Sequence, residues 1–179
     1  MPEIEVRTGT VDDFESLSAI EHGYNSEHVW QVNLNATSES ARAVFQRIRL
    51  PRRIFVPYPR QRKTIFSKIG QEEDFLIAVL ADQSVGYIKT TKEENAEVAR
   101  VLDLVVSTPF RRQGIASGLV LAMMEYIRHQ NCHTMVLQMQ SKNDPAISMA
   151  FKLGFNFCGF MDHFFPNNDL SLFFSRSTR

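Results

Sequence analysis

The chain has 179 residues, and its acidic and basic residues balance to a formal net charge of zero. A composition of 44% hydrophobic and 22% charged residues is typical of a soluble globular protein, and the length favours one domain over residues 1–179. Because the net charge is zero, no overall electrostatic field attracts the chain to nucleic acid or to a membrane. No apolar run reaches the roughly 18 residues of a membrane-spanning helix.

Residues 4–8 alternate between apolar and polar side chains, and we expect them to form the first strand. A helix is predicted after Thr10, because threonine is a favoured helix cap and acidic residues follow it in the first turn. Phe14, Leu17 and Ile20 then recur at helical spacing, which indicates one buried face.

Residues 22–40 have no clear period, whereas residues 41–70 contain nine basic residues and no acidic one. We expect a strand over residues 43–50, then an extended segment interrupted by prolines, then a short helix from Arg60. So basic a stretch could bind RNA or an acidic partner, but it lacks the aromatic platform of RNA-binding sheets. We therefore expect a solvated face and no nucleic-acid partner, and some of its arginines could border a substrate site.

The rest of the chain alternates strands and helices. Strands are predicted over residues 75–80, 85–89, 97–106, 134–140, 155–160 and 170–175, and a long helix over residues 114–129. A shorter helix begins after Asn143 or Asp144, with Pro145 in its first turn, and ends at Gly154. A strand–helix–strand unit requires a parallel strand pair. The strands over residues 75–80 and 85–89 form an antiparallel hairpin. We therefore expect an α/β fold with a mixed sheet and helices on its faces.

The stretch RRQGIASG, residues 111–118, joins a predicted strand to a predicted helix. Its small residues permit a tight turn, and the first N–H groups of a helix lack intrahelical acceptors and carry partial positive charge. The turn could therefore cradle a phosphate, with Arg111 and Arg112 adding charge. The alternative is a tight turn with surface arginines. No Lys-Ser or Lys-Thr follows the glycine, which excludes a nucleotide P-loop, and the three-glycine dinucleotide pattern is absent.

The segment LDLVVSTPFRRQGIASGLVLAMMEYI resembles the acetyl-CoA-binding segment of the GCN5-related N-acetyltransferases (GNAT), whose turn reads Gln/Arg-x-x-Gly-x-Gly/Ala. Arg111, Gly114 and Ala116 occupy those positions here. The similarity continues to NDPAISMAFKLGF and covers residues 97–160, and VRTGTVDDFESLSAIE is similar to the first strand and helix of the family. The C-terminal LGFNFCGFMDHFFPNNDLSLFF resembles the branch that includes the streptothricin acetyltransferases.

The resemblance implies a single GNAT domain: a mostly antiparallel sheet of about six or seven strands, with helices on both faces and one parallel pair that splays apart. It implies acetyl-CoA as co-substrate and no metal. The pantetheine arm would bond to the backbone of Leu104, Val105 and Val106, and Asn143 would contact the cofactor. The pyrophosphate would bind at the turn formed by Arg111, Arg112, Gln113, Gly114, Ile115, Ala116 and Ser117.

The resemblance also implies direct attack of a primary amine on the thioester, with a small-molecule amine as the expected acceptor. The amine must first lose a proton, and Asp103 matches a position where relatives carry an acid. Strand alternation predicts that Asp103 faces the same side as Val101 and Val105, and we expect it to act as the base, directly or through water. The alternative is a carboxylate that orders the amine or pairs with an arginine.

Two further residues are expected near the acceptor. Glu97 lies beside the same strand and is the next candidate base, and Trp30 matches the acceptor-side wall of the family, with core packing as the alternative. A backbone N–H of the pair Val105–Val106 is the expected donor to the oxyanion. His22 and His28 flank the expected acceptor loop and could shuttle protons, although structural roles are the more frequent use of single histidines.

One departure from the family pattern concerns the departing thiolate. A tyrosine often stands where this chain has Ala150, and Tyr87 and Tyr126 are the options elsewhere. A thiol has a pKa of about 8.5, so the thiolate could also leave without an acid. The missing tyrosine is the argument for an alternative, a non-catalytic acyl-CoA-binding or regulatory domain; a protein or peptide N-acetyltransferase is another.

Cys132 and Cys158 have no partner motif, which indicates reduced thiols in a cytoplasmic protein, while a disulfide between them stays open. The five histidines show no metal-ligand spacing, so no metal is expected. The aromatic segment FMDHFFPNN could form an acceptor wall or the edge of a homodimer.

Overall fold

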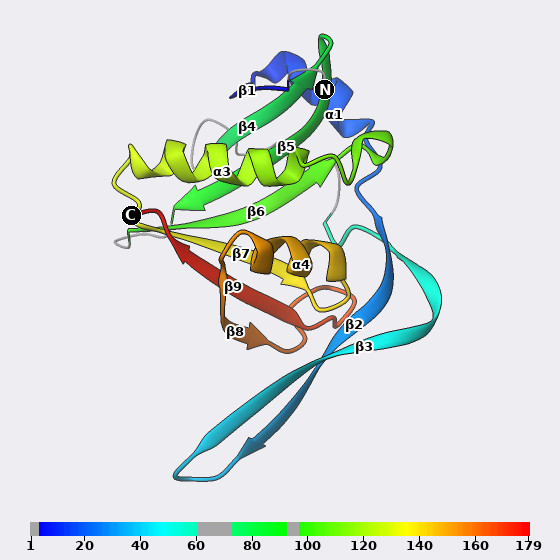
Figure 1. Cartoon of the computed structure of the whole chain (residues 1–179), viewed down its shortest axis with the longest axis vertical. Coiled ribbons are helices and arrows are strands. Elements are labelled where there is room, and N and C mark those ends of the chain that lie inside the picture. Colours follow the sequence, from blue (N-terminus) through cyan, green and yellow to red (C-terminus); the bar gives the residue numbers. More distant parts are fainter. Residues whose placement is uncertain (1–3, 61–72, 93–96) are drawn as a thin grey trace.

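Seven strands form the central sheet of the computed structural model, which describes residues 4–60, 73–92 and 97–179 (Figure 1). They are β1 (Glu5–Thr8), β4 (Glu73–Leu80), β5 (Gln83–Lys92), β6 (Val98–Val106), β7 (Thr134–Gln140), β8 (Asn156–Met161) and β9 (Ser171–Ser177). Their order is β1-β4-β5-β6-β7-β9-β8, and neighbours are antiparallel except for the parallel pair of β6 and β7. The predicted mixed, mostly antiparallel sheet is confirmed.

The helices of the described residues include two 3-10 turns and are Val11–Asp13, α1 (Phe14–Ser18), Thr108–Phe110, α3 (Ile115–Arg128) and α4 (Asp144–Lys152). The N-terminal helix is shorter than predicted, because Ile20 lies beyond its end. The predicted helix from Arg60 falls largely on residues 61–72, which lie outside the described residues. Among the helices that are described, none is long and apolar enough to cross a membrane.

Alternate residues of the sheet face two separate cores. Leu76 and Ala78 of β4 belong to the core that α3 and α4 cover, whereas Phe75 and Ile77 belong to the core that contains Leu17 of α1. Figure 1 shows α3 and α4 together in front of the sheet. Helices therefore cover both faces, as predicted.

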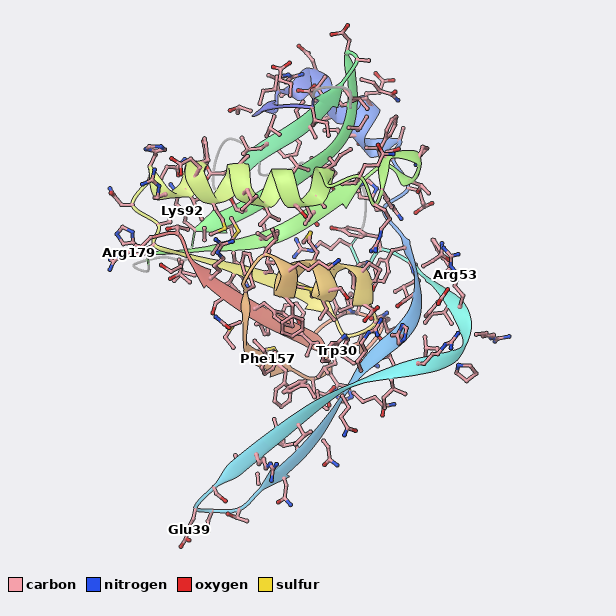
Figure 2. All side chains as sticks on the ribbon, in the orientation of Figure 1. Trp30, Glu39, Arg53, Lys92, Phe157 and Arg179 are labelled. Atoms are coloured by element: carbon pink, nitrogen blue, oxygen red, sulfur yellow. The ribbon has the colours of Figure 1, made fainter. Side chains whose placement is uncertain are left out.

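β2 (Tyr24–Ala36) and β3 (Ala41–Val56) form a separate antiparallel ribbon that runs from the sheet into solvent (Figure 1). Glu39 lies at its tip (Figure 2). The outer half of the ribbon is exposed on both faces, so residues 22–40 lack the alternation by which a half-buried strand is recognised. The strand predicted over residues 43–50 is confirmed as part of β3.

The inner half of the ribbon is held to the body by aromatic contacts. Trp30 packs against Phe151 of α4 with ring centroids 5.8 Å apart, and Phe45 packs against Phe157 of β8 at 4.1 Å. Because an isolated two-stranded ribbon is marginal in water, these contacts are what position its inner half beside α4.

A bulge in β6 changes which side chains share a face. Leu102 is an extra residue that has no register partner in β5. Val101, before it, packs in the core under α3, whereas Val105, after it, packs in the core under α1. Asp103 therefore faces the α1 side with Val105 and not the side of Val101. The prediction from strict alternation was right for Val105 and wrong for Val101, because one inserted residue reverses the facing of all that follow.

Candidate active site

The parallel pairing of β6 and β7 is short, running from Val98 with Thr134 to Val101 with Leu137. Beyond these residues the strands part and open a cleft of about 940 Å³. Residues 101–106 and 137–140 form its floor, which includes the three residues expected to bind the pantetheine arm. The predicted splayed pair is confirmed.

The turn before α3 faces this cleft. Arg112 and Gly114 both have left-handed backbone conformations, with φ of 67° and 87°. A Cβ at Gly114 would meet no atom within 4 Å, so glycine is needed there for its backbone and leaves the space above the helix start open. Ala116 and Ser117 also line the cleft. The unpaired N–H groups and positive end of α3 therefore border the cleft.

Arg111 lines the cleft, but its guanidinium is engaged by the protein. Nε donates to the carbonyl of Val106 at 2.7 Å, Nη1 to that of Gly23 at 2.9 Å and Nη2 to that of Glu21 at 2.7 Å. Burial lowers the pKa of this guanidinium below its ordinary value. Arg111 thus clamps the turn to the loop before β2, and Arg112 is the exposed arginine of this turn.

The other three residues expected to bind the cofactor differ in which of their groups is available to a ligand in the cleft. Gln113 is exposed, lies off the cleft lining and donates to the Pro109 carbonyl at 3.2 Å. The side chain of Ile115 is buried in the core, so only its backbone is available to a ligand. Asn143 lines the cleft and caps α4, its Oδ1 accepting from the Ala146 N–H at 3.3 Å.

Asp103 lies on the floor of the cleft, and its side chain has no solvent exposure of its own. The hydroxyl of Tyr58 donates to its Oδ1. Lys89 Nζ lies 3.2 Å from its Oδ2 and also 3.0 Å from Glu73 Oε2, and Arg60 Nη1 lies 3.8 Å from the same Oδ2. Burial, then the charge of Asp103, raises the pKa of Tyr58 well above its ordinary value, so that hydroxyl stays protonated and donates.

Beneath Asp103 a second polar pair is buried. His22 Nδ1 lies 2.6 Å from the Ile20 carbonyl, which can only accept, so Nδ1 donates. When the ring is neutral, Nε2 accepts from the Tyr87 hydroxyl at 2.9 Å. Burial raises the pKa of Tyr87, which keeps this hydroxyl protonated. His22 lines the cleft but, with both nitrogens bonded, it orients Tyr87 rather than reaching outward.

Asp144, at the start of α4, connects the ribbon to the cleft. Arg47 of β3 binds it with two hydrogen bonds, Nε to Oδ1 at 2.6 Å and Nη2 to Oδ2 at 2.9 Å, and Trp30 Nε1 donates to Oδ1 at 3.3 Å. The bonds from Arg47 hold the pKa of Asp144 below its usual range. His28 Nδ1 lies 3.7 Å from Oδ2. Trp30 is not among the residues that line the cleft, and its contact with the site is this hydrogen bond to Asp144.

Glu97 is not part of this site, contrary to the prediction. It precedes β6 at the end where β6 and β7 are still paired, and its carbonyl accepts from the N–H groups of His133 and Thr134. Its side chain is 66% exposed and lies 3.5 Å from His133 Nε2. The cleft opens at the opposite end of β6, so a carboxylate at position 97 cannot reach it.

The tyrosines of the cleft are not those considered from the sequence. Ala150 is fully buried in the core, Tyr87 is fully buried and Tyr126 donates to Asp74 Oδ1 at 3.3 Å, away from the cleft. Tyr24 and Tyr58 line the cleft instead.

Sequence reasoning also missed Lys89, Tyr58 and the pair of Arg47 with Asp144. Lys89 had a usable signal, since a lone cation inside the apolar strand VGYIKTT is as unusual as Asp103 in its own strand. The described residues contain no group of three or more histidine, cysteine or acidic side chains able to hold a metal ion. Cys132 and Cys158 are both free thiols.

The chain matches the acetyltransferase (GNAT) family over residues 37–155. No curated protein sequence matches it significantly.

Solved structures of several acetyltransferases share the fold over nearly the whole chain. Nourseothricin acetyltransferase superposes with a TM-score of 0.83 at 18% identity, covering 98% of this chain and 99% of its own. A candidate streptothricin acetyltransferase from Bacillus anthracis, solved with acetyl coenzyme A, gives a TM-score of 0.80 at 18% identity and 98% coverage of both chains. The ribosomal-protein-S18-alanine N-acetyltransferase of Escherichia coli gives 0.70 at 14% identity, covering 98% and 94%.

Proposed function

The chain belongs to the acetyltransferase (GNAT) family, and on this premise we propose that it transfers the acetyl group of acetyl-CoA to the primary amine of a small molecule. The observation that carries the proposal is the cleft between β6 and β7, which opens opposite the N-terminus of α3 and has one buried carboxylate on its floor. Such a cleft offers an anion site, an extended strand edge and a proton acceptor in one space.

The cofactor would be held mainly by backbone. The N–H groups of residues 112–117 suit the pyrophosphate, because the helix start supplies donors and partial positive charge without bulk. Leu104, Val105 and Val106 lie beyond the last β6–β7 pair, so their strand edge is open to the amides of the pantetheine arm. Lys152 of α4 and Arg112 line the same cleft and add positive charge for the phosphates.

The reaction begins with loss of a proton from the acceptor ammonium, since only the neutral amine carries the lone pair that attacks. Asp103 would take that proton, directly or through water, while Tyr58 and Lys89 fix the orientation of its carboxylate. The nitrogen then bonds to the thioester carbon, and the oxyanion accepts from a backbone N–H of Val105 or Val106.

Collapse of the tetrahedral intermediate breaks the carbon–sulfur bond and releases the CoA thiolate. A thiol of pKa about 8.5 is a good leaving group, so this step does not require the tyrosine that Ala150 replaces. Tyr24 and Tyr58 line the cleft, but their hydroxyls donate to Gln140 Oε1 and Asp103 Oδ1 and burial raises the pKa of both, so the thiolate would take its proton from water.

The proposal is tested by mixing the full-length protein with acetyl-CoA and a panel of amines, and measuring free thiol. The panel holds aminoglycosides, streptothricin, polyamines, amino acids and peptides with free N-termini. Thiol release that depends on a small-molecule amine supports the proposal. Release only with peptides would reassign the acceptor to a protein N-terminus, and acetyl-CoA binding without any release would contradict amine transfer.

A further inference from the structure

The lining of the cleft contains more basic than acidic side chains. Its lining carboxylates in the described residues are Glu27, Asp103 and Asp144. Asp103 is held by Lys89 and Tyr58, and Asp144 by two hydrogen bonds from Arg47. The two buried carboxylates are therefore already compensated by groups of the chain itself.

Two guanidiniums of the same lining are not compensated in this way. Arg60 has Asp103 as its only acidic contact among the described residues, at 3.8 Å, and Lys89 lies closer to the same oxygen. Arg53, on the outer curve of β3 (Figure 2), has no acidic group within ion-pair distance among the residues described. Glu27 also lines a second cavity with Arg49, Arg52 and Arg53, so one carboxylate is shared there by three arginines.

An independent observation comes from Gln138 of β7, on the floor of the cleft. Both atoms of its amide, Oε1 and Nε2, are shielded from solvent, and neither has a hydrogen-bond partner in the described part of the chain. Alternation along β7 places it on the face of Gln140, opposite to Leu137 and Met139, which lie in the core under α3. This is the face that Asp103 also occupies. A buried amide without partners is costly, which indicates that a ligand satisfies it.

We propose that the acceptor is a small molecule with a carboxylate close to its primary amine, an amino acid being the simplest member. This rests on the proposed function. The carboxylate would pair with Arg60 and accept from Nε2 of Gln138, whose Oε1 would accept from the amine. Because Arg60 and Asp103 are neighbours, the carboxylate and the reacting amine of the acceptor are held close together.

The first test compares matched acceptors that differ only in the carboxylate: lysine with cadaverine, and ornithine with putrescine. We expect kcat/KM to be about tenfold or more higher for the amino acid of each pair, as one charged hydrogen-bonded contact would give. Equal values, or a preference for the diamines, would contradict the inference.

The second test is the variant Arg60→Gln, with Arg49→Gln as a control that lies outside the cleft lining. Arg60→Gln should raise KM for the amino acid about tenfold more than KM for the diamine, and should leave the affinity for acetyl-CoA unchanged. Arg49→Gln should leave KM for the amino acid, KM for the diamine and the affinity for acetyl-CoA unchanged. A loss of acetyl-CoA affinity in Arg60→Gln would instead assign Arg60 to the cofactor and overturn the inference.

Binding of the acceptor can be measured apart from the reaction. Calorimetric titration of lysine and cadaverine into the CoA-saturated protein gives the same comparison without turnover. Tighter binding of lysine, lost in Arg60→Gln, supports the carboxylate site even where no acetyl transfer occurs. Transfer to diamines with no preference for lysine would uphold the proposed function and refute this inference.

Discussion

Lys89 and Asp103 face each other across β5 and β6, with Nζ 3.2 Å from Oδ2 and side chains that are 2% and 0% exposed. Lys89 also lies 3.0 Å from Glu73 Oε2, so one ammonium serves two carboxylates. A buried ion pair with this geometry stabilises the fold little compared with an apolar pair, but it fixes where Asp103 points. The arrangement thus positions the proposed base.

Replacing Asp103 by Asn should lower turnover by about 10²-fold, because general base catalysis contributes on that order. Affinity for acetyl-CoA should stay nearly intact, since the amide preserves the shape of the side chain. Steady-state kinetics and calorimetry measure the two effects.

Glu97→Gln is the matched control for this experiment, since it removes a carboxylate just before the same strand but outside the cleft. It should leave the rate and its pH profile unchanged. Full turnover in Asp103→Asn, with loss in Glu97→Gln, would show that the base is misassigned.

Lys89→Met should destabilise the fold by about 3 kcal/mol, because it removes the nearest cation from two buried carboxylates. Chemical denaturation measures the loss. Lys92→Met, on the exposed end of the same strand, is the control and should change stability little. The double variant Lys89→Met/Glu73→Gln should recover part of the loss; no recovery would mean that the ion pair is not its cause.

Gly114→Glu should weaken acetyl-CoA binding strongly. The carboxylate would project into the open space above the helix start, and φ of 87° is unfavourable for any residue with a Cβ. Leu121→Glu places the same charge on an exposed position of α3 and should bind acetyl-CoA normally. Calorimetry that gives equal affinities for the two variants would refute the phosphate site.

Asp13 makes stability depend on pH in the acid range. Hydrogen bonds from Arg7, against the opposing effect of burial, hold the pKa of Asp13 at about 2, below its ordinary value of 3.8. A lowered pKa stabilises the fold above the ordinary value, and this stabilisation is lost as pH falls from 3.8 to about 2.

We therefore expect Asp13→Asn to cost about 1–2 kcal/mol at pH 6, after allowance for the partial exposure of Arg7. The difference from wild type should shrink as the pH falls below 3.8. Asp12→Asn, one residue earlier and exposed, is the control. A difference that stays constant with pH would assign the loss to packing instead of charge.

The sequence by itself determined the parallel strand pair, the glycine turn at residues 111–118 and the acidic character of Asp103. These features are local: a helix start needs a particular backbone within a few residues, and a strand–helix–strand unit follows from the order of elements. The family resemblance drew on the same local order. The family could therefore be recognised without knowledge of any contact between distant segments.

Only the tertiary structure decided which face Asp103 occupies and what surrounds it. The bulge at Leu102 depends on the register of β5, which no period in β6 reveals. Tyr58 and Lys89 reach Asp103 from other segments, and Arg111 is engaged by carbonyls about 90 residues away in the chain. Local sequence patterns indicate the secondary structure of one element and the direction of its side chains. The partners of a buried charge are set by how the elements pack against one another.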